Sequence, residues 1–155
     1  MSRIQLIEKK ISELSFDSSR IIIISGPTGI GKSELAISLA QKINGSIINA
    51  DSMQIYKELK IISSQPSYED KKIVSHYLYG IKSICCKFSV VEWLELVKNK
   101  VDLILSKNET PIIVGGTGLY IKSTLFGISK IPKVDDTIFE KCIKLSEKVG
   151  ILEFR

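Results

Sequence analysis

The sequence predicts an α/β fold, in which helices flank a parallel β-sheet. Short β-branched runs at 21–24 and 112–114 are typical of strands that are covered on both faces. Each run leads into glycines, and the first is followed by Leu35, Leu39 and Ile43 at helical spacing. Strands that alternate with helices in this way pair in parallel through right-handed crossovers.

We expect parallel strands near residues 21–25, 46–50 and 111–115, and a further strand within 73–81. Glycine commonly follows the last turn of a helix, so Gly45 is expected to end the helix before the second strand. Pro111 is expected to stop a long helix before the last strand.

Helices are predicted from apolar spacing and from end signals. Residues 3–14 predict a leading helix, and Ser89 and Glu92 have the spacing of a capping box at the start of a long helix. The segment after residue 115 turns into a helix that is expected to end near Gly127. The long helix carries an apolar stripe of Val90, Leu94, Val97, Val101 and Leu105.

The composition is that of a globular protein: 155 residues allow one domain with a modest core. Its apolar runs are too short to cross a bilayer, so we expect no membrane association. Cys85, Cys86 and Cys142 match neither a disulfide framework nor a metal-binding spacing, which favours free thiols in the cytoplasm. The net charge of +5 fits either a polyanionic partner or a solvated basic surface.

Residues 26–33 read GPTGIGKS and match G-x-x-x-x-G-K-S/T between a predicted strand and a predicted helix. Backbone N–H groups of such a loop form an anion nest, at which the following helix aims its positive end. The side chain of Lys32 adds a full charge, and the Ser33 hydroxyl is placed to ligate Mg²⁺. The motif therefore predicts a phosphate or diphosphate ligand, but no particular reaction. The expected binding residues are Gly26, Pro27, Thr28, Gly29, Ile30, Gly31, Lys32 and Ser33.

Residues 47–56 read IINADSMQIY, so polar side chains follow directly on a buried strand. Ligands of open α/β sheets bind beyond the carboxyl ends of the strands, so Asp51 and the phosphate loop are expected to face one cleft. Asp51 could hold Mg²⁺ or take a proton from an adenine amine, with Ser52, Gln54 and Tyr56 at the ring edge. Alternatively, Asp51 and Ser52 only cap the next segment.

Four segments in this order, GPTGIGKS, INADSMQIY, SHYL and PIIVGGTGLYIKSTLFG, resemble the bacterial tRNA dimethylallyltransferases, or tRNA isopentenyltransferases. The likeness covers about residues 20–132. It implies a sheet like that of P-loop NTPases. It also implies transfer of a dimethylallyl group from dimethylallyl diphosphate to N6 of the adenosine that is 3′-adjacent to the tRNA anticodon, with Mg²⁺ as cofactor.

The resemblance implies individual roles as well. Asp51 is the implied general base, and Thr117 lies near the transferred group; both are implied catalytic residues. Thr117 also opens a helix, so an N-cap role can coexist with the catalytic one. The target base must leave the anticodon-loop stack to reach the site. The implied tRNA-binding residues are Asp51, Ser52, Met53, Gln54 and Thr117.

The chain departs from the family pattern at several positions. Ser63 and Gln65 stand where the family usually has threonine and lysine, which puts one phosphate or tRNA contact in doubt. Gly80 lies near the place of a usual acid, and Phe139 near that of an arginine.

Family members also continue beyond Arg155 for roughly the same length again. We therefore expect residues 1–132 to be the N-terminal part of the core and 133–155 to begin a helical tRNA-binding insert, with the rest of the domain absent. Asp136 is expected to cap a helix over 137–148. The chain could thus be an incomplete or inactive form, and we expect a monomer.

Two alternatives remain open. A small-molecule kinase would use the same loop with ATP, and Asp51 would activate a hydroxyl. A phosphate-binding remnant without catalysis is favoured by the C-terminus and disfavoured by the retained Lys32, Ser33 and Asp51. Among the remaining residues, His76 is expected to be structural or to contact tRNA, Trp93 to lie in the core, and Tyr120 to pack internally.

Overall fold

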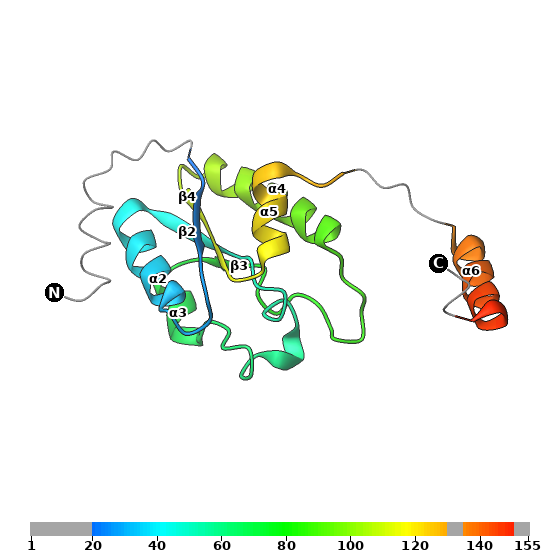
Figure 1. Ribbon diagram of the computed structural model, residues 1–155. Helices are drawn as coiled ribbons and strands as arrows, with labels where there is room; N and C mark the ends of the chain where they lie inside the picture. The colour runs from blue at the N-terminus through cyan, green and yellow to red at the C-terminus, as the bar shows by residue number, and fades with distance from the viewer. Residues whose placement is uncertain (1–19, 130–134, 151–155) are drawn as a thin grey trace.

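The computed structural model describes residues 20–129 and 135–150, which include four parallel strands in one sheet (Figure 1). The strand order is β1-β4-β2-β3, so the last strand in sequence lies between the first two. The α/β prediction is confirmed, and the three main strands lie within one residue of the expected positions. The strands are β1 (Ile22–Ser25), β2 (Gly45–Asn49), β3 (His76–Tyr77) and β4 (Thr110–Gly115).

Helices cover both faces of this sheet, as Figure 1 shows with α2 and α3 on one side and α4 and α5 on the other. Side chains alternate across a strand, so neighbouring isoleucines of β2 face opposite helices. Ile47 packs in the cluster with α2, and Ile48 packs in the cluster with α4. The helices are α2 (Lys32–Ile43), α3 (Tyr68–Ile73), α4 (Val90–Ser106), α5 (Gly118–Phe126) and α6 (Asp136–Val149), with a short 3-10 helix η1 at Lys57–Leu59.

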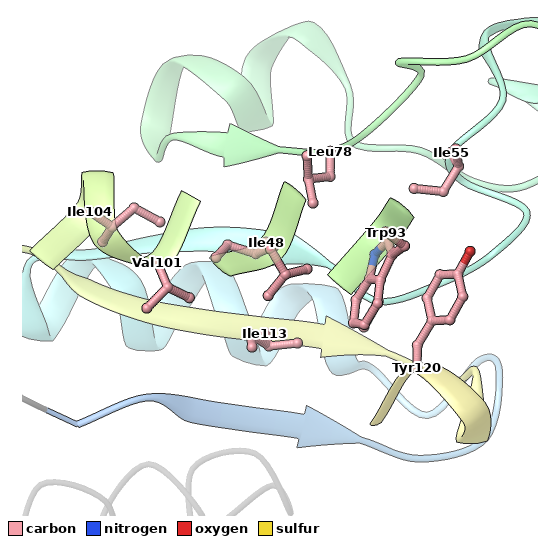
Figure 2. Close-up of a cluster of buried hydrophobic side chains, with 10 residues drawn as sticks. Ile48, Ile55, Leu78, Trp93, Val101, Ile104, Ile113 and Tyr120 are labelled. Carbon is pink, nitrogen blue, oxygen red and sulfur yellow. The ribbon is translucent and has the colours of Figure 1, made fainter. Parts of the chain in front are cut away.

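The larger core lies under α4 and α5 and is built around Trp93 (Figure 2). Trp93 is fully buried and donates from its indole Nε1 to the Asn49 carbonyl oxygen at 3.0 Å. The Tyr120 ring stacks on it with centroids 4.1 Å apart and planes 16° apart. Both residues therefore pack internally, as predicted.

The predicted capping box at the start of α4 is present, with reciprocal bonds between Ser89 and Glu92. Two other predicted helix ends are wrong by one residue. Asn44 ends α2 with a left-handed φ of 51°, whereas Gly45 already belongs to β2. A Cβ at Gly45 would lie 2.7 Å from Ile112 Cδ1 and 3.2 Å from both Ala40 Cα and the Thr110 carbonyl oxygen, so the space at this position is tight. Asp135, not Asp136, caps α6 by accepting from the Thr137 N–H.

The predicted leading helix over 3–14 lies outside the described residues. Within the described part of the chain, no helix has both the length and the apolar character needed to span a bilayer. Cys85, Cys86 and Cys142 are free thiols, as expected.

Candidate functional site

Three loops meet at the carboxyl edge of the sheet, because β4 lies between β1 and β2 and all three strands are parallel. The loop after β4 touches both neighbours. Thr117 N–H donates to the Ala50 carbonyl at 3.3 Å, and a Cβ at Gly116 would lie 3.3 Å from the Gly26 carbonyl oxygen. The same Cβ would lie 4.0 Å from Lys32 Nζ. The phosphate loop and the Asp51 segment therefore flank one site, as predicted.

The phosphate loop has the backbone that an anion nest needs. Gly29 and Gly31 have φ values of 81° and 92°, a region in which any other residue would be strained. Gly31 is also the N-cap of α2, so the helix begins at the loop. Lys32 bends back over the loop and donates from Nζ to the Pro27 carbonyl oxygen at 2.7 Å. Residues 27–30 are exposed, so this part of the loop is open to solvent.

The segment after β2 fixes the backbone around Asp51. The Asn49 side chain accepts from Asp51 N–H at 2.8 Å and donates to the Asp51 carbonyl oxygen at 3.0 Å. One carboxylate oxygen, Oδ1, accepts from Met53 N–H at 2.9 Å. Asp51 therefore does cap the following turn, as the structural alternative predicted. No hydrogen bond from a described residue reaches its second oxygen, Oδ2.

Thr117 links the third loop to this segment. Its Oγ1 accepts from Ser52 N–H at 2.9 Å, and its own hydroxyl donates to Ser52 Oγ at 3.3 Å. The residue occupies the N-cap position of α5 but makes no side-chain cap bond to that helix. The Thr117 hydroxyl therefore bonds to Ser52 and not to the start of α5. These bonds hold Ser52 and Thr117 together at the site.

Two of the predicted tRNA-binding side chains, those of Met53 and Gln54, differ in whether they are free to contact a ligand. Met53 is 51% exposed beside Asp51. The Gln54 amide instead donates inward, to the carbonyl oxygens of Ser63 and Ser64 at 2.8 and 3.1 Å. Gln54 thus holds a neighbouring turn, a contact between segments that the sequence pattern did not reveal.

The Gln65 departure also has a structural outcome. Its Nε2 donates to the Tyr56 carbonyl oxygen at 2.8 Å. Gly80 has a left-handed φ of 59°, and a Cβ there would lie 3.1 Å from Gln65 Oε1. The glutamine is therefore built into the turn, and it holds the backbone of Tyr56 close to the site.

Two tyrosines that the motif analysis did not assign to the site lie near Asp51. Burial, with Tyr56 and Asp51 close by, raises the pKa of Tyr120 to about 12. Burial and the same carboxylate raise the pKa of Tyr79 well above its usual range. Both phenols therefore stay protonated, and each can serve as a hydrogen-bond donor. Tyr79 follows the short strand β3, which is too weak a periodic signal to place it from sequence.

A small cavity of about 80 Å³ lies between the start of α2 and the end of β3, next to the phosphate loop. Ser33, Asp70, His76 and Tyr79 are among its lining residues. His76 donates from Nδ1 to the Val74 carbonyl oxygen at 2.8 Å, and its ring meets Tyr79 edge-on at 5.6 Å. His76 therefore has the structural surroundings that we expected.

Burial lowers the pKa of His76 below its ordinary 6.5. The unfolded chain then binds more protons than the folded one, so stability is full above about pH 6.5 and declines as the pH falls toward the folded pKa. We expect His76→Asn, which keeps a donor for Val74, to lose less unfolding free energy than the parent between pH 7 and pH 5. The difference between parent and variant in the loss of unfolding free energy cannot exceed about 1.4 kcal/mol per pH unit.

Urea unfolding at the two pH values measures this difference. His76 is the only histidine, and the carboxyl pKa values that folding lowers, at Glu58, Asp70 and Asp135, act at lower pH. An equal decline of the unfolding free energy in parent and variant would show that His76 has the same pKa in the folded and the unfolded chain.

The described residues contain no group of three or more histidine, cysteine or acidic side chains that could hold a metal alone. One side-chain oxygen donor is present at the loop, the hydroxyl of Ser33 in the first turn of α2. This donor fits a magnesium ion that takes most of its ligands from a bound diphosphate and from water, because Mg²⁺ keeps several waters and uses few protein ligands.

A parallel sheet with a glycine-rich phosphate loop after its first strand defines the class of P-loop α/β proteins. Within that class, the profile of one family, described as IPP transferase, matches residues 54–153. The chain belongs to the IPP transferase family.

Its relatives agree with this assignment. The tRNA dimethylallyltransferases of Pelagibacter ubique and Ehrlichia chaffeensis are 47% and 41% identical over 136 residues, which is 88% of this chain and 44% and 45% of theirs. The full-length tRNA isopentenylpyrophosphate transferase of Bacillus halodurans is 29% identical with a TM-score of 0.68, over 86% of this chain and 45% of that one. A eukaryotic dimethylallyltransferase acting on tRNA is 29% identical with a TM-score of 0.68, over 83% of this chain and 36% of that chain. The chain spans about half the length of the curated relatives that it matches.

Proposed function

We propose that this chain carries the diphosphate site and the acceptor acid of a tRNA dimethylallyltransferase. The observation that carries the proposal is the contact of the 115–117 loop with both the phosphate loop and the Asp51 segment. An enzyme that joins an allylic diphosphate to an adenine amine needs an anion site and a proton acceptor on either side of the reacting atoms. The relatives' names support the same reaction.

The diphosphate end of dimethylallyl diphosphate would bind in the nest of residues 26–33. Lys32 would exchange its bond to Pro27 for a phosphate oxygen, and Ser33 would hold Mg²⁺ together with the diphosphate. The ion would neutralise charge that develops on the leaving group. Electrostatic stabilisation of this kind is often the largest catalytic contribution.

The bond between the allylic carbon and the diphosphate oxygen breaks with both electrons going to the diphosphate. The adenine N6 forms the new bond to that carbon and loses one proton, which passes to the Asp51 carboxylate. The oxygen that Met53 does not occupy is the available acceptor. Ser52, Met53, Gln54 and Thr117 would position the base, and Gln54 would do so through the turn that its amide holds.

The proposal includes the anticodon loop of tRNA as partner, a cytoplasmic location and a monomer. Incubation of the chain with labelled dimethylallyl diphosphate, Mg²⁺ and unmodified tRNA tests it. Label on the RNA is the expected result. Nucleotide-dependent ADP formation without tRNA would instead identify a kinase, and diphosphate binding without transfer would identify a remnant.

Lys32→Ala is expected to weaken pyrophosphate binding by about 10- to 100-fold, because a charge-assisted hydrogen bond contributes about 1.5–3 kcal/mol. Titration calorimetry with pyrophosphate and Mg²⁺ measures the affinity. Lys107→Ala, which removes an equal charge at the far end of α4, is the control and should bind like the parent. Equal affinities for all three proteins would contradict the placement of the ligand in the loop.

A further inference from the structure

Asn49 ends β2 as a fully buried polar side chain, directly after the buried Ile47 and Ile48. All of its side-chain bonds go to the site edge of the sheet. Oδ1 accepts from Asp51 N–H at 2.8 Å, while Nδ2 donates to the carbonyl oxygens of Asp51 and Leu78 at 3.0 and 3.1 Å. An acceptor faces the N–H and two donor hydrogens face the carbonyls, so the amide orientation is unambiguous.

These bonds hold Asp51 from both ends of its backbone. One side chain satisfies both its N–H and its C=O, and the Met53 N–H then fixes one carboxylate oxygen. Asn49 is itself anchored, because the Trp93 indole donates to its carbonyl at 3.0 Å. A continuous series of hydrogen bonds therefore runs from the core under α4 to the carboxylate.

The third bond joins Asn49 to Leu78, the residue that follows β3. Leu78 has a left-handed φ of 64°, a conformation that is strained for a residue with a β-carbon. The Asn49 amide supplies a partner for the carbonyl of this strained residue. Tyr79 follows immediately, and burial, with a smaller contribution from the Asp51 carboxylate, raises its pKa. Asn49 thus ties the Asp51 segment to the side of the site that carries Tyr79.

We infer that Asn49 is a positioning residue that sets the orientation of the Asp51 carboxylate for proton transfer; this rests on the proposed function. Asparagine is disfavoured in strands, and a buried amide is costly unless every polar atom finds a partner. Here the amide is placed where a shift of the carboxylate by about 1 Å can cost about 100-fold in rate.

The test compares Asn49→Ala and Asn49→Ser with the matched control Ser46→Ala. Ser46 is 1% exposed, lies on the same strand at its opposite end, and bonds to Glu109, so its loss removes a buried hydrogen bond away from the site. Thermal unfolding establishes that each variant is folded. Serine keeps one short hydroxyl, so Asn49→Ser is both the milder change and the variant to use should Asn49→Ala fail to fold.

Single-turnover transfer is expected to fall by about 10-fold or more in Asn49→Ala, less in Asn49→Ser, and not in Ser46→Ala. Diphosphate affinity should remain within about twofold of the parent, because the three side-chain hydrogen bonds of Asn49 do not touch the phosphate loop. A structural role alone would weaken both quantities together or neither. A turnover equal to that of Ser46→Ala would overturn the inference.

Amide hydrogen exchange at Asp51 separates this inference from the proposed function, because it needs no substrate. The Asp51 amide is expected to lose protection from exchange in Asn49→Ala but not in Ser46→Ala. Unchanged protection in Asn49→Ala would overturn the inference that Asn49 holds the Asp51 backbone. A parent chain that transfers no label would overturn the proposed function instead, and the exchange measurement would still decide whether Asn49 holds Asp51.

Discussion

Asp51→Asn is expected to slow dimethylallyl transfer by about 100-fold or more, within the range for a lost general base. Asparagine keeps the size and an acceptor oxygen for Met53 N–H, so the turn after β2 should persist. It has no negative charge to draw the proton from the adenine amine. Diphosphate affinity should barely fall and could rise, because a nearby anion is removed. Single-turnover transfer at saturating tRNA, beside a pyrophosphate titration, measures both quantities.

A second acid provides the control for this experiment. Asp102 lies on α4, away from the carboxyl edge of the sheet, and Asp102→Asn should change neither turnover nor affinity. A kinase or a phosphate-binding remnant predicts no split between the two measurements, since neither deprotonates an adenine amine. Near-normal turnover of Asp51→Asn would show that Asp51 only caps the turn at Met53.

Gly115→Ala is expected to destabilise the fold by about 3 kcal/mol or more, at the upper end of overpacking costs. A Cβ at this position would lie 2.1 Å from the Ala50 carbonyl oxygen and 2.2 Å from its carbonyl carbon. Both clashing groups are backbone, and the neighbouring bond from Ala50 N–H to the Val114 carbonyl, at 2.7 Å, keeps the strands from separating. Chemical denaturation with urea measures the change in unfolding free energy.

Gly118→Ala is the matched comparison, because a Cβ there would meet no atom within 4 Å beyond its chain neighbours and the backbone of its own helix, and its φ is not left-handed. Alanine in the first turn of α5 should leave stability unchanged or raise it slightly. Equal stability of the two variants would show that β2 and β4 can move apart at this point.

The features predicted correctly are those that adjacent residues encode. The phosphate loop, the capping box at Ser89 and the strand that contains Ile112 each depend on a short stretch of sequence. Contacts between distant segments were not predictable in the same way. The inward bond of Gln54 to Ser63 joins two turns that carry no shared periodic pattern. Tyr79 follows β3, whose place is set by its pairing with β2.

The helix end at Asn44 illustrates the same limit. Asparagine and glycine can both adopt the left-handed conformation, so local preference did not decide between Asn44 and Gly45. The folded chain places Asn44 in the left-handed region and Gly45 in β2, where the space beside β4 is tight. Asn49 carried no signal either: a polar residue at the end of an apolar strand is common, and its significance comes from the three bonds that the folded chain provides.

The strand order also has a consequence for the route by which the chain folds. β1 and β2 are joined by one helix, yet neither pairs with the other, because β4 is inserted between them. The nest and Asp51 are present early in synthesis, but no site exists until residues 110–117 have left the ribosome and closed a loop across most of the chain. Such long-range closure is slow, since its entropy is lost before any contact is gained. We therefore expect nascent chains that stop before β4 to expose β1 and the edge of β2 that does not face β3, and to depend on chaperones until that strand arrives.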